Sequence, residues 1–152
     1  MAGFEDAYLQ TTAPQIGVRE SRRVVGEYML TAEELLSACK FEDGIARGTY
    51  PVDIHNPNGE GTVIKYLKPG EWYEIPFRCL VPKRIENLLV GGRPVSATHE
   101  AHSAIRVQPI AIALGQAAGA AAALCVQSGE LPRELDVCVL QNALKEQGAR
   151  LS

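Results

Sequence analysis

The feature that most constrains this chain is a run of small and apolar residues from Ile110 to Val126, which only Gln116 interrupts. A run of this length forms a helix, which either lies in a protein core or spans a membrane. Pro109 is typical of a helix start because its fixed φ suits the first turn, and Gly129 is typical of a C-terminal cap. The sequence therefore predicts a helix over residues 109–128.

Composition favours the soluble form of this helix. Ala and Gly dominate, and Gly115 and Gly119 form a G-x-x-x-G pattern. In membranes this spacing marks close helix pairing, whereas in a soluble α/β fold small residues let a helix lie tightly against a sheet. Because a short apolar run and a polar loop precede the helix, we expect it to be buried in a soluble protein.

A short strand and a polar loop are expected just before the helix. Residues 88–90 are Leu-Leu-Val, and Gly91 and Gly92 end this apolar run, as happens in a strand buried on both faces. The loop then leads to the helix start, where the first backbone N–H groups lack partners and the helix dipole is positive. This arrangement predicts an anion site.

The first half of the chain predicts short elements. Thr31 and Glu34 have the spacing of a capping box, so a helix should cover residues 32–39. Residues 22–30 mix β-branched and aromatic side chains and predict a strand, and residues 41–48 are expected to form a helical turn. Alternating segments between turns predict a small antiparallel sheet. Its strands should be residues 50–55, 62–67 and 72–80, with a turn at 56–61.

The end of the chain predicts an amphipathic helix. Leu135, Val139, Leu140 and Leu144 fall on one helical face, and Gly148 should lie near the helix end.

With 152 residues, of which 46% are hydrophobic and 22% charged, the chain has the composition of an ordinary globular protein. One domain is the natural expectation at this length.

Charge and cysteines narrow the class of protein. The formal net charge is −3, and the basic cluster of Arg19, Arg22 and Arg23 is interleaved with Glu20 and Glu27. Nucleic acid and anionic membranes select for clustered Lys and Arg, so neither is an expected partner.

The four cysteines show no C-x-x-C spacing. Free thiols in a reducing compartment are favoured over disulfides, and the N-terminus carries no signal-peptide pattern. We therefore expect a cytoplasmic protein.

Three blocks of the chain resemble a bacterial family of FAD-dependent oxidoreductases whose fold is similar to that of glutathione reductase. The resemblance is carried by Gly92-Arg93, Ser96-Ala97-Thr98-His99, Arg106-Val107-Gln108-Pro109 and Gly115-Gln116-Ala117-Ala118-Gly119, and upstream by residues 17–28 and 73–80. It implies an α/β fragment that holds the last strand and following helix of the FAD-binding fold, a small antiparallel sheet and a C-terminal helix. Residues 1–86 would then be a substrate-facing or cap-like β portion, and residues 87–152 the C-terminal part of the FAD-binding fold.

One motif expected of such a flavoprotein is not found in the sequence. The G-x-G-x-x-G turn, which binds the pyrophosphate of FAD through backbone N–H groups, does not occur in these residues. The chain is therefore expected to be the C-terminal piece of a longer enzyme, and alone it should not hold FAD tightly. With strand edges and an apolar helix face uncovered, we also expect self-association.

The resemblance implies a set of cofactor-binding residues around the loop and helix start. Arg93 could meet a phosphate with its guanidinium fork, or it could simply pair with Glu86 or Glu100. The backbone at the helix start is expected to approach the flavin ring or ribityl chain. The full set is Gly92, Arg93, Arg106, Val107, Gln108, Pro109 and Ile110.

His99 and His102 are the candidate catalytic residues. An imidazole can take a proton from a substrate hydroxyl while hydride leaves for the flavin. Each histidine could equally be structural, and the pair could bind a metal, although no third ligand is evident and we assign no metal residue. Arg78 could hold a substrate anion or form a salt bridge with Glu74.

Three functions stay open on the sequence. The resemblance favours hydride transfer between a small organic substrate and flavin by the parent enzyme. A binding or assembly module without cofactor or catalytic activity is the alternative. A metal-dependent hydrolase that uses His99 and His102 is the third.

Overall fold

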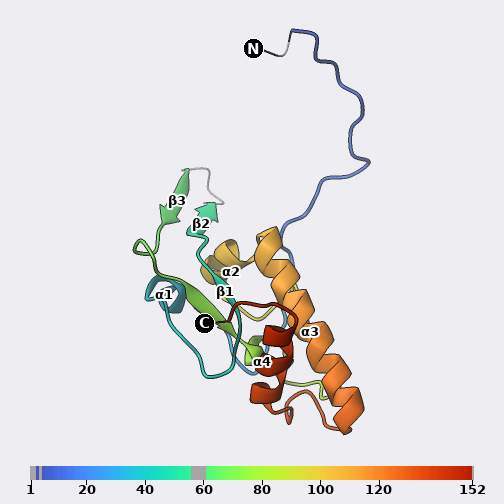
Figure 1. Ribbon diagram of the computed structural model, residues 1–152. Coiled ribbons are helices and arrows are strands. Elements are labelled where there is room, and N and C mark those ends of the chain that lie inside the picture. The colour runs from blue at the N-terminus through green and yellow to red at the C-terminus, as the bar shows by residue number, and fades with distance from the viewer. Residues whose placement is uncertain (1–2, 4, 56–60, 152) are drawn as a thin grey trace.

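In the computed structural model, which describes residues 3, 5–55 and 61–151, one short helix and four short strands precede a 3-10 turn and three further helices (Figure 1). This confirms a mixed α/β chain with small antiparallel sheets. The elements are α1 (Ala32–Leu36), β1 (Gly44–Gly48), β2 (Val52–His55), β3 (Thr62–Lys65), β4 (Tyr73–Pro76), the 3-10 turn η1 (Phe77–Cys79), α2 (His99–Ile105), α3 (Gln108–Ser128) and α4 (Val137–Glu146).

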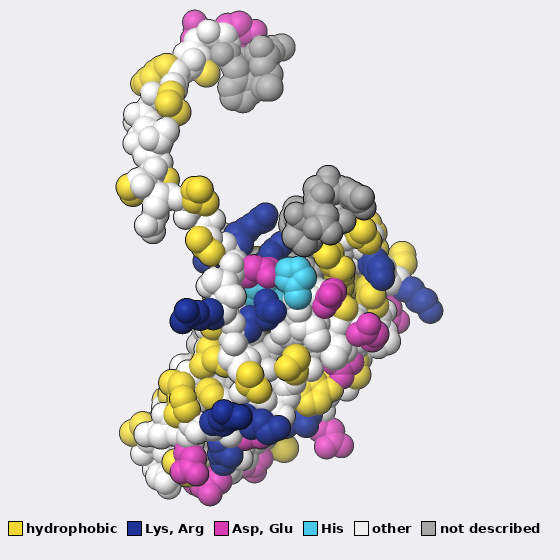
Figure 2. All heavy atoms as spheres, turned by 180° about the vertical axis from the view of Figure 1, so that it is seen from behind, with side chains coloured by type: hydrophobic (Ala, Val, Ile, Leu, Met, Phe, Trp, Pro, Cys, Tyr) yellow, Lys and Arg dark blue, Asp and Glu magenta, His cyan; other side chains and the backbone are white. Residues whose placement is uncertain are grey.

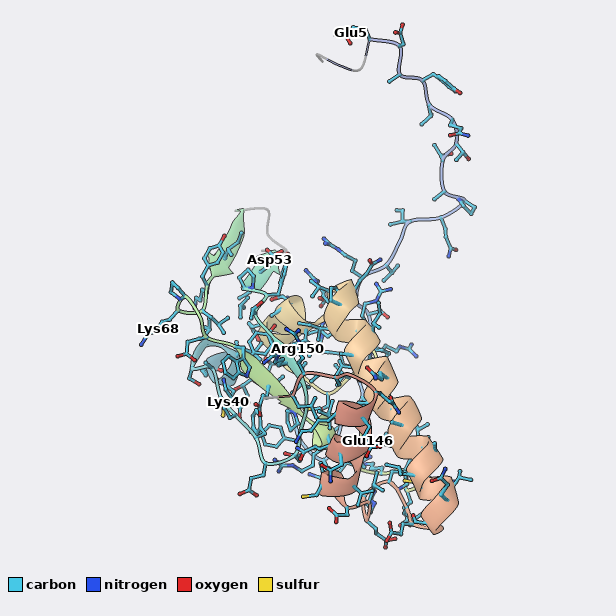
Figure 3. All side chains as sticks on the ribbon, viewed as in Figure 1. Glu5, Lys40, Asp53, Lys68, Glu146 and Arg150 are labelled. Carbon is cyan, nitrogen blue, oxygen red and sulfur yellow. The ribbon has the colours of Figure 1, made fainter. Side chains whose placement is uncertain are left out.

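The N-terminal segment is an extended arm that leaves the body of the protein (Figure 1). Glu5 lies at its far end, remote from the other labelled residues (Figure 3). The arm carries exposed apolar side chains, among them Tyr8, Leu9 and Ile16. No packing within the described residues therefore covers this part of the chain.

Residues 22–30 do not form the predicted strand. The segment runs past several neighbours and makes only isolated backbone hydrogen bonds to each. Val24 N–H donates to the Pro94 carbonyl (2.8 Å), and Glu27 N–H donates to the Val81 carbonyl (2.9 Å). Isolated bridges at Gly26 and Leu30 are its only β pairing among the described residues. A strand needs one continuous neighbour, and this segment has several short ones.

The capping box at the start of α1 is confirmed. Thr31 N–H donates to Glu34 Oε2 (2.8 Å), and Glu34 N–H donates to Thr31 Oγ1 (3.4 Å). The helix ends at Leu36, before the expected residue 39, and Ala38 adopts a left-handed φ of 55°.

Two separate two-stranded sheets replace the single sheet that was predicted. Strand β1 pairs antiparallel with β4, and β2 with β3. The helical turn predicted over residues 41–48 is wrong, because residues 44–48 pair with β4. The strand predicted over residues 72–80 stops at Pro76, which has no N–H for a ladder, and η1 follows. The predicted turn at 56–61 lies outside the described residues except for Gly61.

Helix α3 buries one face and exposes another, so the expectation of a buried helix holds for one side only. Ile110, Leu114, Ala117, Ala121 and Cys125 are buried on the inner side, which packs on β1 and α4. Among the described residues, α3 is the one helix long and apolar enough to cross a membrane, by length and composition only. We use the name outer face of α3 for its exposed apolar stripe, formed by Ile112, Gly115, Gly119, Ala122 and Val126.

The strand predicted at residues 88–90 is not formed. Val90 N–H donates to the Leu80 carbonyl (2.9 Å), but no strand of the described residues runs beside this segment. Gly91 then lies directly on α3, since a Cβ there would meet the Cα of Gly115 and the carbonyl of Leu114 at 3.1 Å. The small residues of α3 thus admit the close approach of a loop.

Helix α4 confirms the predicted amphipathic helix, but not every residue that was predicted on its buried face. Leu140 and Leu144 are buried, as is Leu135 just before the helix, whereas Val139 is 47% exposed and does not share that face. Asp136 caps the helix by accepting from the Cys138 N–H (2.9 Å). The helix ends at Glu146, and Gly148 follows with a positive φ of 88°.

Candidate functional site

Glu20 is the centre of a charged cluster at the root of the N-terminal arm. Its Oε1 lies 2.8 Å from His99 Nδ1, and its Oε2 lies 3.3 Å from His102 Nδ1. Arg106 also donates to Oε2, and Arg23 donates to Oε1 at 3.4 Å. Figure 2 shows histidine beside acidic and basic side chains on this face. The two predicted catalytic histidines are therefore brought together on one carboxylate.

Helix α2 explains why both histidines reach the same carboxylate. The predicted polar loop contains this helix, which Thr98 caps by accepting the Ala101 N–H (3.2 Å). Residues three apart on a helix share a face, so His99 and His102 both point toward Glu20.

His102 is fully buried and bonded at both ring nitrogens. Its Nε2 lies 2.7 Å from the carbonyl oxygen of Arg93, which can only accept, so this nitrogen carries a proton. Its Nδ1 can donate to Glu20 only when the ring is doubly protonated. The side chain of His102 has no exposed surface, whereas that of His99 is 48% exposed and lies outside the lining of the neighbouring pocket.

The cluster keeps Glu20 ionised. Burial by itself would raise the pKa of its carboxyl group. The hydrogen bond from His102 and the positive charges of His102, His99 and Arg106 outweigh that effect, and the pKa is lowered.

A pocket of about 790 Å³ adjoins this cluster at the start of α3. Arg106 belongs to both, since it donates to Glu20 and lines the pocket. Arg19 and Arg93 also line the pocket, so three arginines border one cavity. The rest of the lining is Tyr50, Asp53, Ser103, Val107, Gln108, Pro109, Ala111 and Ile112.

Most of the predicted cofactor-binding residues line this pocket, namely Arg93, Arg106, Val107, Gln108 and Pro109. The other two do not. Ile110 is buried in the core, and Gly92, with a φ of 82°, takes the backbone through the turn before Arg93.

The start of α3 presents unpaired donors. Val107 is its N-cap and makes no side-chain capping bond. Gln108 is the first helical residue and Pro109 the second, so the helix begins one residue earlier than predicted. The N–H groups of Gln108 and Ile110 have no partner within the helix, and the dipole is positive here. The site can attract and orient an anionic group.

Two arginines have different partners from those the sequence suggested. Arg93 is exposed and donates to the Val18 carbonyl (3.2 Å), and within the described residues it forms no ion pair with Glu86 or Glu100. Arg78 pairs with Asp43 through two hydrogen bonds (2.8 and 3.2 Å), so the predicted pair with Glu74 is wrong.

A larger pocket of about 870 Å³ lies elsewhere, between η1 and the residues before α4. Arg78 lines it, but its guanidinium is engaged by Asp43 and lies 4.7 Å from the centre of the Tyr28 ring. None of the candidate catalytic or cofactor-binding residues that the sequence predicted lies there. We therefore place the candidate site at the start of α3.

The arrangement of metal-ligating side chains and cysteines bears on two further kinds of site. No group of three or more His, Cys, Asp or Glu in the described ranges is arranged to hold a metal ion. All four cysteines are free. The predicted free thiols are confirmed, with Cys79 and Cys125 buried.

Glu20 is the functional candidate that sequence reasoning missed. It stood out only as one acid among Arg19, Arg22 and Arg23. Its partners at 99–106 lie about 80 residues away in the chain, and no local pattern shows that the two segments meet.

Comparison with known proteins agrees with the resemblance noted in the sequence. A protein family described as FAD dependent oxidoreductase matches residues 1–144. No curated protein and no solved structure matches the chain. Because the family match spans nearly all of the 152 residues, the chain belongs to the FAD-dependent oxidoreductase family.

Proposed function

We propose that this chain is the C-terminal part of a bacterial FAD-dependent oxidoreductase with a glutathione-reductase-like fold. The whole enzyme would transfer hydride between a small organic substrate and flavin. The observation that carries this proposal is the pocket at the start of α3, where Arg93, Arg106 and an uncapped helix N-terminus converge. These are the residues that the resemblance assigned to the cofactor.

The residues present fit FAD. Three arginines and Gln108, whose N–H has no partner within α3, line the pocket, and such groups suit anionic or electron-rich groups. When bound, FAD supplies the hydride acceptor or donor. Arg93 and Arg106 would hold and orient it, and the positive end of α3 would stabilise negative charge in the pocket.

His99 is the base that we propose for this reaction. It is half exposed, and Glu20 joins it to Arg106 at the pocket. In alcohol oxidation the substrate C–H bond breaks as hydride leaves, and His99 would take the proton of the hydroxyl. The buried His102 would hold Glu20 in place.

The missing N-terminal half is also part of the proposal. No G-x-G-x-x-G turn occurs in the sequence, and the described residues leave Leu88 and most of the outer face of α3 exposed. We propose that a dinucleotide-binding half of the parent covers both, with residues 1–86 toward the substrate and 87–152 completing the FAD-binding fold. The four free thiols support a reducing, cytoplasmic location.

The test is the flavin content of the full-length parent. The purified parent should be yellow with bound FAD, and Arg93→Ala should lower the FAD retained per protein. Arg84→Ala is the matched control, because Arg84 is exposed and lies outside the pocket. The 152-residue chain alone should be colourless. A parent without flavin, or equal loss in both variants, would contradict the proposal.

A second candidate is a binding or assembly module without cofactor. The exposed outer face of α3 favours it, since apolar surface of this kind marks association sites. It would replace the first proposal if the parent gene encoded only these residues and the product were a stable oligomer that binds no FAD.

A further inference from the structure

We propose that Glu20 is a positioning residue whose carboxylate holds the Nδ1–H of His99 and leaves Nε2 of that ring as the proton acceptor. The role of Nε2 in catalysis rests on the proposed function. The proton position on the ring does not, and it can be measured in the 152-residue chain.

Glu20 and His99 are in direct contact. Oε1 lies 2.8 Å from Nδ1, and an ionised carboxylate only accepts hydrogen bonds. The proton of a neutral His99 must therefore sit on Nδ1, and Nε2 keeps its lone pair. Nε2 has no hydrogen-bond partner in the described part of the chain, and the side chain is 48% exposed, so this lone pair is accessible.

Other residues hold the Glu20 carboxylate in place. His102 and Arg106 engage Oε2, and Arg23 lies 3.4 Å from Oε1. His102 is itself fixed by the Arg93 carbonyl at 2.7 Å. The hydrogen bond and charges of this shell outweigh burial and lower the pKa of Glu20, so the acceptor stays ionised near neutral pH.

The positioning role of Glu20 differs from that of an ordinary salt bridge. A salt bridge needs only a positive ring, and its carboxylate would contribute to stability alone. A positioning carboxylate also selects the tautomer of the neutral ring, as the acid does in a catalytic triad. No other contact in the described residues fixes the ring of His99, so Glu20 alone would make this choice.

The experiment is nitrogen-15 NMR of the imidazole rings, and it is favoured by the presence of only three histidines. At a pH where His99 is neutral, the wild-type spectrum should show Nδ1 protonated and Nε2 bare. Glu20→Gln should lose this preference, because the amide can either accept or donate. Glu27→Gln is the control: Glu27 pairs with Arg133 at 3.1 Å, away from both histidines, and the tautomer should not change.

Two results would overturn the inference. The first is a wild-type His99 with its proton on Nε2. The second is a Glu20→Gln protein that keeps Nδ1 protonated. If Glu20→Gln does not fold, as its amide spectrum would show, the wild-type tautomer decides the question.

The parent enzyme separates this inference from the proposed function. Glu20→Gln should lower kcat by about 10-fold to 100-fold with little change in KM, and should alter the pH profile of kcat. If the tautomer is as expected but His99→Ala leaves turnover intact, the proposed base is wrong and the positioning contact stands. If the parent holds flavin but the tautomer is reversed, the positioning role fails and the flavin assignment stands.

Discussion

Glu20 shows how one residue can join distant parts of the chain. Its carboxylate links the root of the N-terminal arm to α2 and to the start of α3. Each partner is positive or can become so, and the side chain of His102 is fully buried. Removal of this carboxylate would leave several cationic donors without an acceptor, which costs more than the loss of a surface pair.

The lowered pKa of Glu20 predicts a pH-dependent contribution to stability. A carboxyl group whose pKa is lower in the folded state stabilises the fold above its unfolded pKa, which is near 4.5 for a glutamate, and loses that effect as pH falls toward the folded value. The difference in free energy of unfolding between wild type and Glu20→Gln should be largest near pH 7 and should shrink below about pH 4.5. Urea unfolding at several pH values measures it, and a difference that grows in acid would contradict it.

The thiols should differ in reactivity. Cys79 is fully buried, and burial raises the pKa of its thiol to about 12, whereas Cys138 is exposed. Because the thiolate is the reactive form, a thiol reagent should modify Cys138 in the folded protein and Cys79 only after denaturant is added. Mass spectrometry of the labelled peptides would show the order. Early labelling of Cys79 in a folded Cys138→Ser protein would argue against this packing.

At the scale of elements, the inner side of α3 organises the fold. It packs on β1 and α4, and the contact with β1 depends on a residue without a side chain. At Gly48, a Cβ would lie 2.6 Å from the ring of Tyr73 and 2.7 Å from Cδ1 of Ile110. Tyr73 is fully buried and Ile110 nearly so, so a Cβ at Gly48 would press on core side chains.

Gly48→Ala should therefore destabilise the fold by about 1–3 kcal/mol, the usual cost of overpacking a core. Gly119→Ala is the matched control, since a Cβ there meets nothing within 4 Å. In a helix interior this change should stabilise by about 0.5–1 kcal/mol. Urea unfolding of the two variants gives the comparison. Equal stabilities would show that β1 and α3 are less tightly packed than described.

At the scale of the whole molecule, the described residues expose apolar surface on α3 and along the N-terminal arm, among other positions. The outer face of α3 includes Ile112 and Val126, which are 71% and 85% exposed, and the arm exposes Ile16 at 89%. Exposed apolar surface of this extent favours association because burial removes it from water. We propose that another part of the parent enzyme covers the outer face of α3. In the isolated chain, this apolar surface leaves contact with water only if copies of the chain associate.

We therefore predict that the isolated chain self-associates. Ile112→Glu together with Val126→Glu should shift it toward monomer, as measured by light scattering across a concentration series. Val63→Glu is the control, because Val63 is 52% exposed on β3, away from α3. A wild-type chain that stays monomeric at high concentration, or a control that dissociates the oligomer equally, would contradict the prediction.

The accuracy of the sequence predictions followed the range of the interactions involved. The capping box of Thr31 and Glu34 and the cap at Gly129 were predictable because each uses residues a few positions apart. Strand β1 was missed because Gly, Ala and Arg give little strand signal, and its pairing with β4 crosses about 30 residues. For residues 88–90 the apolar pattern was correct, but no neighbouring strand is present among the described residues.

By itself, the sequence determined the long helix to within one residue at its start, the buried positions Leu140 and Leu144 of α4, and the family through three motif blocks, because these depend on local hydrogen bonds and on residue types in order. The tertiary structure alone decided that Glu20 joins His99 and His102, that Arg78 pairs with Asp43, and that Arg19, Arg93 and Arg106 line one pocket. A side-chain contact between distant segments depends on how the backbone between them folds, and no spacing in the sequence encodes that distance.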